Sequence, residues 1–234
     1  MTAPALVLVP GLLCDERLWR HQVEGLADLA GQVVLPEVTG HDSVGGMARA
    51  VLDTAPERFA LAGLSMGGYV SLEVMRRAPD RVEGLALLDT SARPDTPEQT
   101  RARLALVGLA REGRFDEVWR ALLPKIVHPG RVEDPEVRST VREMAHAIGP
   151  GGFGRQESAI IGRPDSRGDL ANISCPALVL CGRDDALTPP YLHEELADGI
   201  PGARLRQIDH CGHLSTLERP EAVTDAMRAW LEAL

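Results

Sequence analysis

The chain has few aromatic residues, almost no lysine and no long apolar run, and each shortage argues against a class of protein. It contains three Phe, three Trp and two Tyr among 234 residues, and Lys125 is the only basic residue that is not arginine. Acidic residues outnumber basic ones by 34 to 25, and the basic residues are scattered. Nucleic-acid binders usually carry a basic stripe, so a nucleic-acid partner is disfavoured. The longest uncharged stretch, Met1–Cys14, contains two prolines and is too short to span a membrane.

The same stretch lacks the basic region and cleavage site of a signal peptide. Four cysteines without a C-x-x-C pair are too few for a disulfide scaffold, so we expect a reduced, cytoplasmic protein. Hydrophobic residues make up 44% and charged residues 25%, which is ordinary for a globular chain and argues against disorder. The sequence does not distinguish a monomer from a homodimer.

Short apolar runs alternate with amphipathic segments over much of the chain. The expected strands are Ala5–Val9, Gln32–Pro36, Arg58–Ala62, Val82–Leu88, Ala177–Cys181 and Ala203–Ile208. The expected helices between and after them are Arg17–Ala30, Met47–Thr54, Tyr69–Arg77 and Glu221–Leu234. This alternation predicts an α/β fold with a mostly parallel sheet of about six strands, flanked by helices.

The alternation stops between the fourth and fifth expected strands, where only helical patterns occur. These patterns cover Pro97–Arg111, Phe115–Leu123, Pro135–Ile148 and Arg155–Ile161, with Pro-Gly clusters between them. We therefore expect residues 1–90 and 175–234 to form the core and residues 91–174 to form a helical insertion.

One turn carries a pattern associated with nucleophilic catalysis. Gly63–Gly67 reads G-x-S-x-G and lies between an expected strand and an expected helix. In that context the serine sits on a strained turn, and the small flanking residues let backbones pass closely. Five residues match by chance often, so the pattern alone does not separate a nucleophilic Ser65 from an incidental serine.

A serine hydroxyl needs a base, and the base needs an orienting acid. Asp184 and Asp185 follow the fifth expected strand, and His210 and His213 follow the sixth. The chain order Ser, Asp, His is the one found in α/β-hydrolases. Each group falls just past the carboxyl end of a strand, where ligands bind in open α/β sheets.

With these motifs in place, the sequence resembles the α/β-hydrolase fold superfamily, in its lid-bearing branch of serine esterases and lactonases. The Val9–Leu12 segment resembles that family's oxyanion loop, with Pro10 in place of the usual histidine. Gly63–Gly68 resembles its nucleophile elbow, Ile173–Pro189 its acid-bearing strand and loop, and His210–His213 its histidine loop.

The resemblance implies a catalytic triad of Ser65, Asp185 and His213, with Asp89 as a second candidate for the acid. It implies that the backbone N–H groups of Leu12 and Met66 form the oxyanion hole. A small ester-like molecule is the implied substrate, and neither a metal nor an organic cofactor is expected.

The resemblance also implies that the helical insertion is a lid over Ser65. The residues of this lid expected to face the pocket, each of which also suits packing between lid helices, are Trp119, Leu122, Met144, His146, Ile148 and Phe153. The scarcity of aromatic residues slightly favours aliphatic or small substrates.

The leading hypothesis is hydrolysis of carboxylic esters, with lactones or thioesters as further substrates. Cleavage of carbon–carbon bonds in β-diketone-like substrates with the same triad is an alternative, and so is a non-catalytic small-molecule receptor on this fold. Haloalkane dehalogenases and epoxide hydrolases of the superfamily carry Asp where this chain has Ser65, so these activities are disfavoured.

Overall fold

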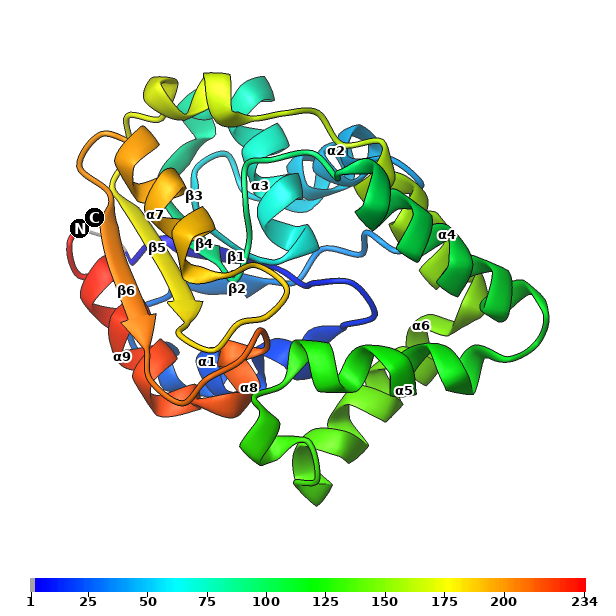
Figure 1. Cartoon of the computed structure of the whole chain (residues 1–234). Coiled ribbons are helices and arrows are strands. Elements are labelled where there is room, and N and C mark those ends of the chain that lie inside the picture. Colours follow the sequence, from blue (N-terminus) through cyan, green and yellow to red (C-terminus); the bar gives the residue numbers. More distant parts are fainter. Residues whose placement is uncertain (1–2) are drawn as a thin grey trace.

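The computed structural model describes residues 3–234, in which one parallel sheet has helices on both faces (Figure 1). Its strands are β1 (Ala5–Val9), β2 (Gln32–Val34), β3 (Phe59–Leu64), β4 (Val82–Leu88), β5 (Ala177–Gly182) and β6 (Arg204–Ile208). The strand order is β2-β1-β3-β4-β5-β6, and every neighbouring pair is parallel. The predicted fold class, a sheet of about six strands in an α/β arrangement, is confirmed.

Strands β1, β3 and β5 are apolar throughout because both faces of the sheet are covered there, whereas the edge strand β6 carries two exposed arginines. In β1 the side chains of Leu6 and Leu8 pack into one hydrophobic cluster, and those of Val7 and Val9 pack into another. Successive side chains of a strand point to opposite faces. An apolar run without polar alternation therefore marks a strand that is buried on both sides.

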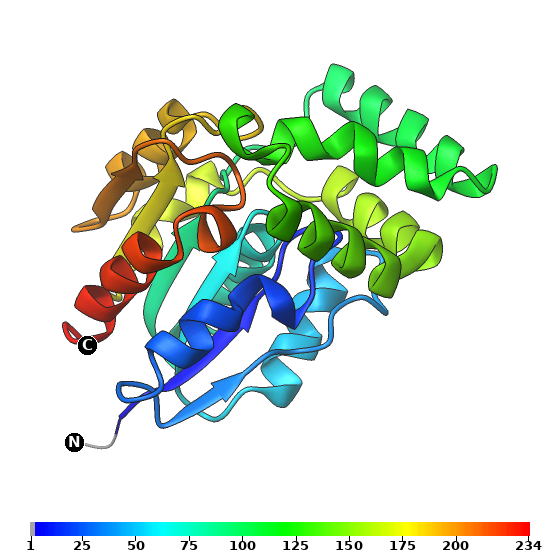
Figure 2. The same ribbon diagram turned by 90° about the horizontal axis from the view of Figure 1, so that it is seen from below.

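Two sets of helices cover the two faces. The helices of the sheet layers are α1 (Arg20–Gly25), α2 (Val44–Thr54), α3 (Met66–Arg77), α7 (Pro190–Gly199), α8 (Ser215–Glu218) and α9 (Pro220–Leu231). Helices α2, α3 and α7 contribute to one cluster, whereas α9 contributes to the other and lies against α1 (Figure 2). Short 3₁₀ turns are η1 (Glu16–Trp19), η2 (Pro79–Arg81), η3 (Pro129–Arg131) and η4 (Arg167–Asn172). Within residues 3–234 no helix has both the length and the apolar character needed to cross a membrane.

Three helices connect β4 to β5 and pack on one another: α4 (Pro97–Arg111), α5 (Phe115–Ile126) and α6 (Pro135–Ile161). Both views show them grouped on the side of the molecule away from the two termini (Figures 1 and 2). The expected helices Pro135–Ile148 and Arg155–Ile161 are joined in α6, which is kinked where Gly149 adopts φ 65°.

The segment that follows α5 is tied to the loop after β6 by hydrogen bonds, two through the side chain of Glu218 and one between backbones. One carboxylate, that of Glu218, accepts from the N–H of Gly212 at 3.1 Å and from that of His128 at 2.8 Å. The N–H of Leu214 donates to the carbonyl of Ile126 at 3.1 Å. These bonds hold the end of α5 beside the loop that carries His213.

The first two expected helices are placed correctly, but the first ends earlier and the second begins earlier than expected. The helix expected over Arg17–Ala30 is a 3₁₀ turn followed by the short α1, which ends at Gly25. Glycine is a poor helix former, and the backbone turns after it. Helix α2 begins three residues earlier than expected because the Ser43 hydroxyl accepts from the N–H of Gly46 at 3.2 Å and caps it.

Candidate active site

Ser65 is the only residue between β3 and α3, and it occupies a strained backbone conformation. Its φ is 54° and its ψ is −112°, a positive φ that L-residues rarely adopt. The Ser65 N–H donates to the carbonyl of Leu88 at 2.9 Å, which fixes the turn against β4. The turn therefore presents the serine side chain at the carboxyl end of the sheet.

The glycines around Ser65 are required by close backbone approaches. A Cβ on Gly63 would lie 2.2 Å from the carbonyl oxygen of Gly67. A Cβ on Gly67 would lie 2.1 Å from the carbonyl oxygen of Val9. Because only a hydrogen fits at either position, glycine is needed for the strand, the turn and the helix to pack this closely.

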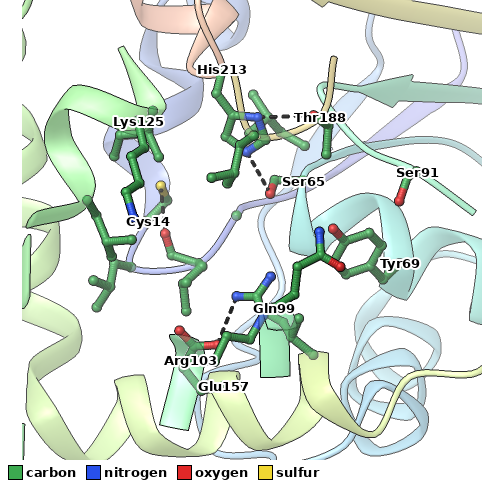
Figure 3. Close-up of a pocket in the computed structure, with 18 of the residues that line it drawn as sticks. Cys14, Ser65, Tyr69, Ser91, Gln99, Arg103, Lys125, Glu157, Thr188 and His213 are labelled. Carbon is green, nitrogen blue, oxygen red and sulfur yellow. Dashed lines mark hydrogen bonds and ion pairs between the residues drawn. The ribbon is translucent and has the colours of Figure 1, made fainter. Parts of the chain in front are cut away.

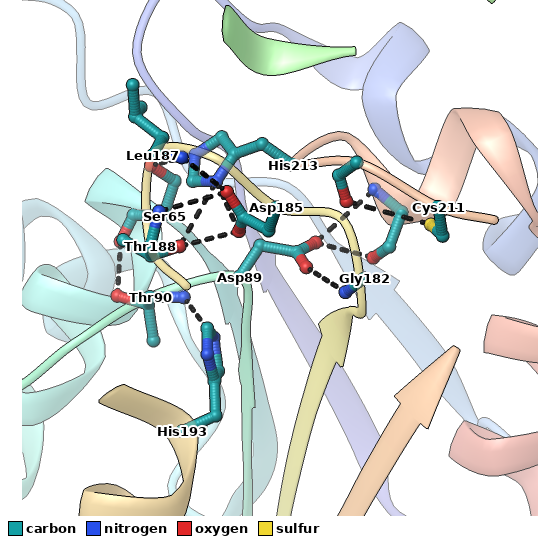
Figure 4. A network of polar contacts seen from close by, with 12 residues as sticks. Ser65, Asp89, Thr90, Gly182, Asp185, Leu187, Thr188, His193, Cys211 and His213 are labelled. Atoms are coloured by element: carbon teal, nitrogen blue, oxygen red, sulfur yellow. Dashed lines mark hydrogen bonds and ion pairs between the residues drawn. The ribbon is translucent and has the colours of Figure 1, made fainter. Parts of the chain in front are cut away.

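The imidazole of His213 lies between Ser65 and Asp185 (Figure 4). Its Nε2 is 2.8 Å from Oγ of Ser65, and its Nδ1 is 2.8 Å from Oδ2 of Asp185. All three residues are buried. Asp184 and His210, the neighbours that the resemblance did not select, are exposed.

The Asp185 carboxylate accepts several further hydrogen bonds. Its Oδ1 accepts from the N–H groups of Leu187 at 2.8 Å and Thr188 at 2.9 Å, and the Thr188 hydroxyl donates to Oδ2 at 2.7 Å. Burial raises the pKa of Asp185, but the charge and hydrogen bond of His213 and the Thr188 donors outweigh it and hold this pKa below its ordinary value. Burial lowers the pKa of His213, yet the attraction of Asp185 raises it overall.

Asp89, the second candidate acid, lies at the end of β4 and is occupied elsewhere. Its Oδ1 accepts from the N–H of Gly182 at 3.1 Å, and its Oδ2 accepts from the hydroxyl of Ser215 at 2.5 Å. Complete burial, together with repulsion by Asp185, raises the pKa of Asp89 well above its ordinary value. The structure thus places Asp185, and not Asp89, in hydrogen-bond contact with the imidazole.

Two backbone N–H groups beside Ser65 are free of acceptors. Within the described residues 3–234, neither the N–H of Leu12 nor that of Met66 donates a hydrogen bond. The next N–H, that of Leu13, donates to Oε1 of the buried Gln156 at 3.0 Å, and Leu13 has a φ of 57°. Gln156 thus fixes the loop after β1 from a distance of 143 residues in sequence, a contact for which the sequence offered no local signal.

Ser65 and His213 open into a cavity of about 370 Å³ between the sheet and the inserted helices (Figure 3). Three of the residues expected to face this pocket line it: Trp119, Leu122 and Met144. Gln99 and Arg103 of α4, Tyr69 of α3 and Glu157 of α6 also line it. None of these four polar residues is among those expected from the sequence to face the pocket.

The other three residues expected to face the pocket, His146, Ile148 and Phe153, do not line the cavity, so the prediction is wrong for them. His146 follows Met144 by two residues on α6, a rotation of about 200° around a helix, and it faces outward, 3.1 Å from Asp116. Phe153 is fully buried and packs on Phe115, with the centroids of the two rings 6.0 Å apart. Ile148 also packs against the hydrophobic core, outside the cavity lining.

One group of metal-type side chains lies near the site. Nitrogen and oxygen atoms of His128, Asp184 and His210 come within 4.8 Å of one another. However, the N–H of Gly130 donates to Nδ1 of His128 at 3.0 Å. A neutral ring then carries its proton on Nε2, the atom that faces Asp184 at 3.6 Å. This arrangement suits a polar pair better than a metal ligand.

The chain is similar to hydrolases over most of its length. A model of the alpha/beta hydrolase family matches residues 6–226. The pimeloyl-[acyl-carrier protein] methyl ester esterase of Nitrosomonas europaea is 29% identical, and the match covers 93% of this chain and 92% of that protein. Further relatives have names that include carbamate hydrolase and non-heme bromoperoxidase.

Two solved structures are similar over nearly the full length. A thermophilic esterase from Thermogutta terrifontis superposes with a TM-score of 0.89 at 33% identity, covering 99% of this chain and 90% of that one. The enol-lactonase from Burkholderia xenovorans LB400 superposes with a TM-score of 0.88 at 29% identity, covering 99% and 92%. These relatives support hydrolase activity and differ in the bond that their names specify.

Proposed function

The chain belongs to the alpha/beta hydrolase family, and on that premise we propose that it is a serine hydrolase of carboxylic esters, with lactones or thioesters as further substrates. The observation that carries the proposal is the continuous contact from Ser65 through His213 to Asp185, with 2.8 Å at each step. Ser65 and His213 line a cavity that is large enough for a small ester.

In the proposed cycle, Oγ of Ser65 attacks the ester carbonyl carbon while Nε2 of His213 takes the hydroxyl proton. The tetrahedral intermediate then expels the alcohol, which leaves with that proton, and Ser65 remains acylated. His213 next removes a proton from water, which attacks the acyl group and releases the acid and the free serine. Asp185 orients the imidazole and stabilises its charged form throughout.

The negative charge of the tetrahedral intermediate needs donors that are already in place. The N–H groups of Leu12 and Met66 suit this role because they flank Ser65 and have no acceptor within residues 3–234. One such donor contributes roughly 3 kcal/mol to transition-state stabilisation. Gln156 holds the neighbouring N–H of Leu13 and thereby the shape of the loop.

A second serine and a cysteine also line the cavity, and neither is placed to act as the nucleophile. Burial, with a smaller contribution from Asp15, raises the pKa of the Cys14 thiol to about 12, so it is neutral at pH 7. Its Sγ lies 3.3 Å from the carbonyl of Leu12. Ser91 is buried and makes no hydrogen bond to His213.

We assign residues 91–174 the role of a lid that completes the substrate pocket. Each of its three α-helices supplies part of the cavity wall, through Gln99, Trp119 and Met144. Water excluded from such a pocket no longer screens the charge that develops during acyl transfer. Movement of the lid is not required for this role.

The proposal is tested with p-nitrophenyl acetate and butyrate, using the wild type and Ser65→Ala. We expect the wild type to hydrolyse both and the variant to lose roughly a million-fold in kcat. A fluorophosphonate probe should label the wild type at Ser65. The matched control is Ser91→Ala, which removes another serine of the same cavity and should keep both labelling and turnover.

Equal rates for the wild type and Ser65→Ala would contradict the proposed nucleophile. Absence of both labelling and turnover would favour a receptor on this fold. Faster cleavage of a vinylogous β-diketone than of either ester would favour carbon–carbon bond hydrolysis.

A further inference from the structure

The cavity wall has a charge opposite in sign to that of the whole chain. The formal net charge of the protein is −9. The Asp, Glu, Lys and Arg residues that line the cavity are Arg93, Arg103, Lys125, Glu157 and Arg163. Four of these five are cationic, so an anion meets a different environment here than on the average surface.

Two of the cations are committed to other partners. Arg93 forms two hydrogen bonds of 2.8 Å with the Glu195 carboxylate. Arg163 contacts Asp95 at 2.6 Å and stacks on the ring of Tyr69, with its guanidinium carbon 4.2 Å from the ring centroid. Both are therefore parts of the wall.

Arg103 is only partly committed. Its Nε donates to Asp95 at 2.7 Å and its Nη1 donates to Glu157 at 2.9 Å, whereas its Nη2 makes no hydrogen bond within residues 3–234. A guanidinium has five N–H donors, so both on Nη2 remain available. Figure 3 shows the guanidinium pointing into the cavity beside Gln99, toward the side on which Ser65 and His213 lie.

The two buried carboxylates hold this guanidinium in place. The side chains of Asp95 and Glu157 are 2% and 1% exposed, and that of Arg103 is 18% exposed. Asp95 bridges Arg103 and Arg163. The cluster of these four side chains is balanced in formal charge, so the uncompensated positive charge of the wall is that of Lys125, which has no ion-pair partner in the described chain, residues 3–234.

We propose that Arg103 binds a carboxylate of the substrate, so that the preferred esters carry a free acid group besides the bond that is cleaved. This inference rests on the proposed function. A planar guanidinium held by two carboxylates presents its remaining N–H groups in a fixed direction, which suits a carboxylate oxygen. Lys125, on α5, adds attraction from a second helix (Figure 3), and apolar residues of the cavity contact the chain between the two ends.

The test compares esters that differ only in the distal group. Monomethyl succinate, glutarate and adipate carry a free carboxylate, and methyl butanoate, pentanoate and hexanoate match them in length without it. We expect at least one acidic ester to exceed its neutral match in kcat/KM by roughly tenfold to a hundredfold, the range for a hydrogen bond to a charged group.

The variants separate anion binding from a purely structural role of Arg103. Arg103→Gln should remove the preference, mainly by raising KM for the acidic ester, so that kcat/KM falls by a larger factor for the acidic ester than for its neutral match. Arg103→Lys keeps the charge and should restore part of the preference. Lys125→Gln, which changes an exposed residue outside the ion cluster, should weaken the preference by roughly twofold to fivefold.

A binding measurement tests the role of Arg103 separately from the proposed ester hydrolysis. Binding of monomethyl adipate and methyl hexanoate to Ser65→Ala, measured by calorimetry, reports the anion contact without turnover. Tighter binding of the acidic ester that depends on Arg103 supports the inference even if the wild type cleaves neither ester. Ser65-dependent cleavage without any preference for the acidic ester, or equal losses for both esters in Arg103→Gln, would overturn it. If Arg103→Gln does not fold, the wild-type preference and Lys125→Gln decide.

Discussion

The hydroxyl of Thr188 donates to Oδ2 of Asp185 at 2.7 Å, the same oxygen that lies 2.8 Å from Nδ1 of His213. Thr188 Oγ1 is also 3.2 Å from that nitrogen. Because Oδ2 has two donors, its position relative to the imidazole is determined from two sides. Thr188, which does not contact Oγ of Ser65, thus positions the imidazole of His213, the proposed base, in the way that outer hydrogen bonds position ligating groups at metal sites.

Replacing Thr188 by Val is therefore expected to lower kcat by roughly tenfold, the cost of one lost hydrogen bond to a charged group. KM should change little because the hydroxyl holds the base. Steady-state kinetics on p-nitrophenyl butyrate measure both. Thr188→Ser keeps the hydroxyl and should retain most of the activity. An unchanged kcat in Thr188→Val would show that the backbone donors to Asp185 suffice.

The two buried aspartates are expected to differ sharply in their contribution to catalysis. If the proposed triad is correct, Asp185→Asn should lower kcat by roughly ten-thousandfold, because the imidazole loses its orienting carboxylate. Asp89→Asn should remain within about tenfold of wild type, because Asp89 contacts Gly182 and Ser215 and not the imidazole. The measurement is kcat for both variants, with circular dichroism as the control for folding. The reverse ranking would assign the acid to Asp89.

The pH dependence of turnover should report the imidazole. Burial lowers the pKa of His213, but the attraction and hydrogen bond of Asp185 raise it above its ordinary value of 6.5. The protonated ring cannot accept the Ser65 proton, so activity is lost as the pH falls through this pKa. We expect the acid limb of kcat/KM to have its midpoint above pH 6.5. A midpoint clearly below that value would mean that burial dominates.

Two glycine substitutions should have opposite effects on stability. In Gly67→Ala the new Cβ would lie 2.1 Å from the carbonyl of Val9, so the free energy of unfolding should fall by at least about 3 kcal/mol. In Gly108→Ala, on α4, the new Cβ meets nothing within 4 Å. A helix gains about 1 kcal/mol from this change. Urea denaturation measures both, and a stable Gly67→Ala would contradict the close packing of the turn.

Local patterns were sufficient for the strands and for the turn that carries Ser65. Strands β1 and β4 have the predicted bounds, because a run that is buried on both faces is mostly apolar; the one charged residue, Glu83, lies near the start of β4 and is partly exposed. The G-x-S-x-G spacing predicted the turn because its glycines satisfy contacts within four residues or with the adjacent strand. Helix α7 was not anticipated, although it begins at Pro190, and proline is well tolerated at the first position of a helix.

Contacts between distant segments depended on the tertiary structure. Thr188 follows Asp185 by three residues, so their hydrogen bond is a local contact that the sequence could have indicated. No comparable signal joins Leu13 to Gln156 or Arg103 to Glu157, which are 143 and 54 residues apart. The first hydrogen bond exists because α6 lies against the loop after β1, and the second because α4 and α6 pack on each other. The net charge of the sequence likewise gave no indication that the cavity wall would be cationic.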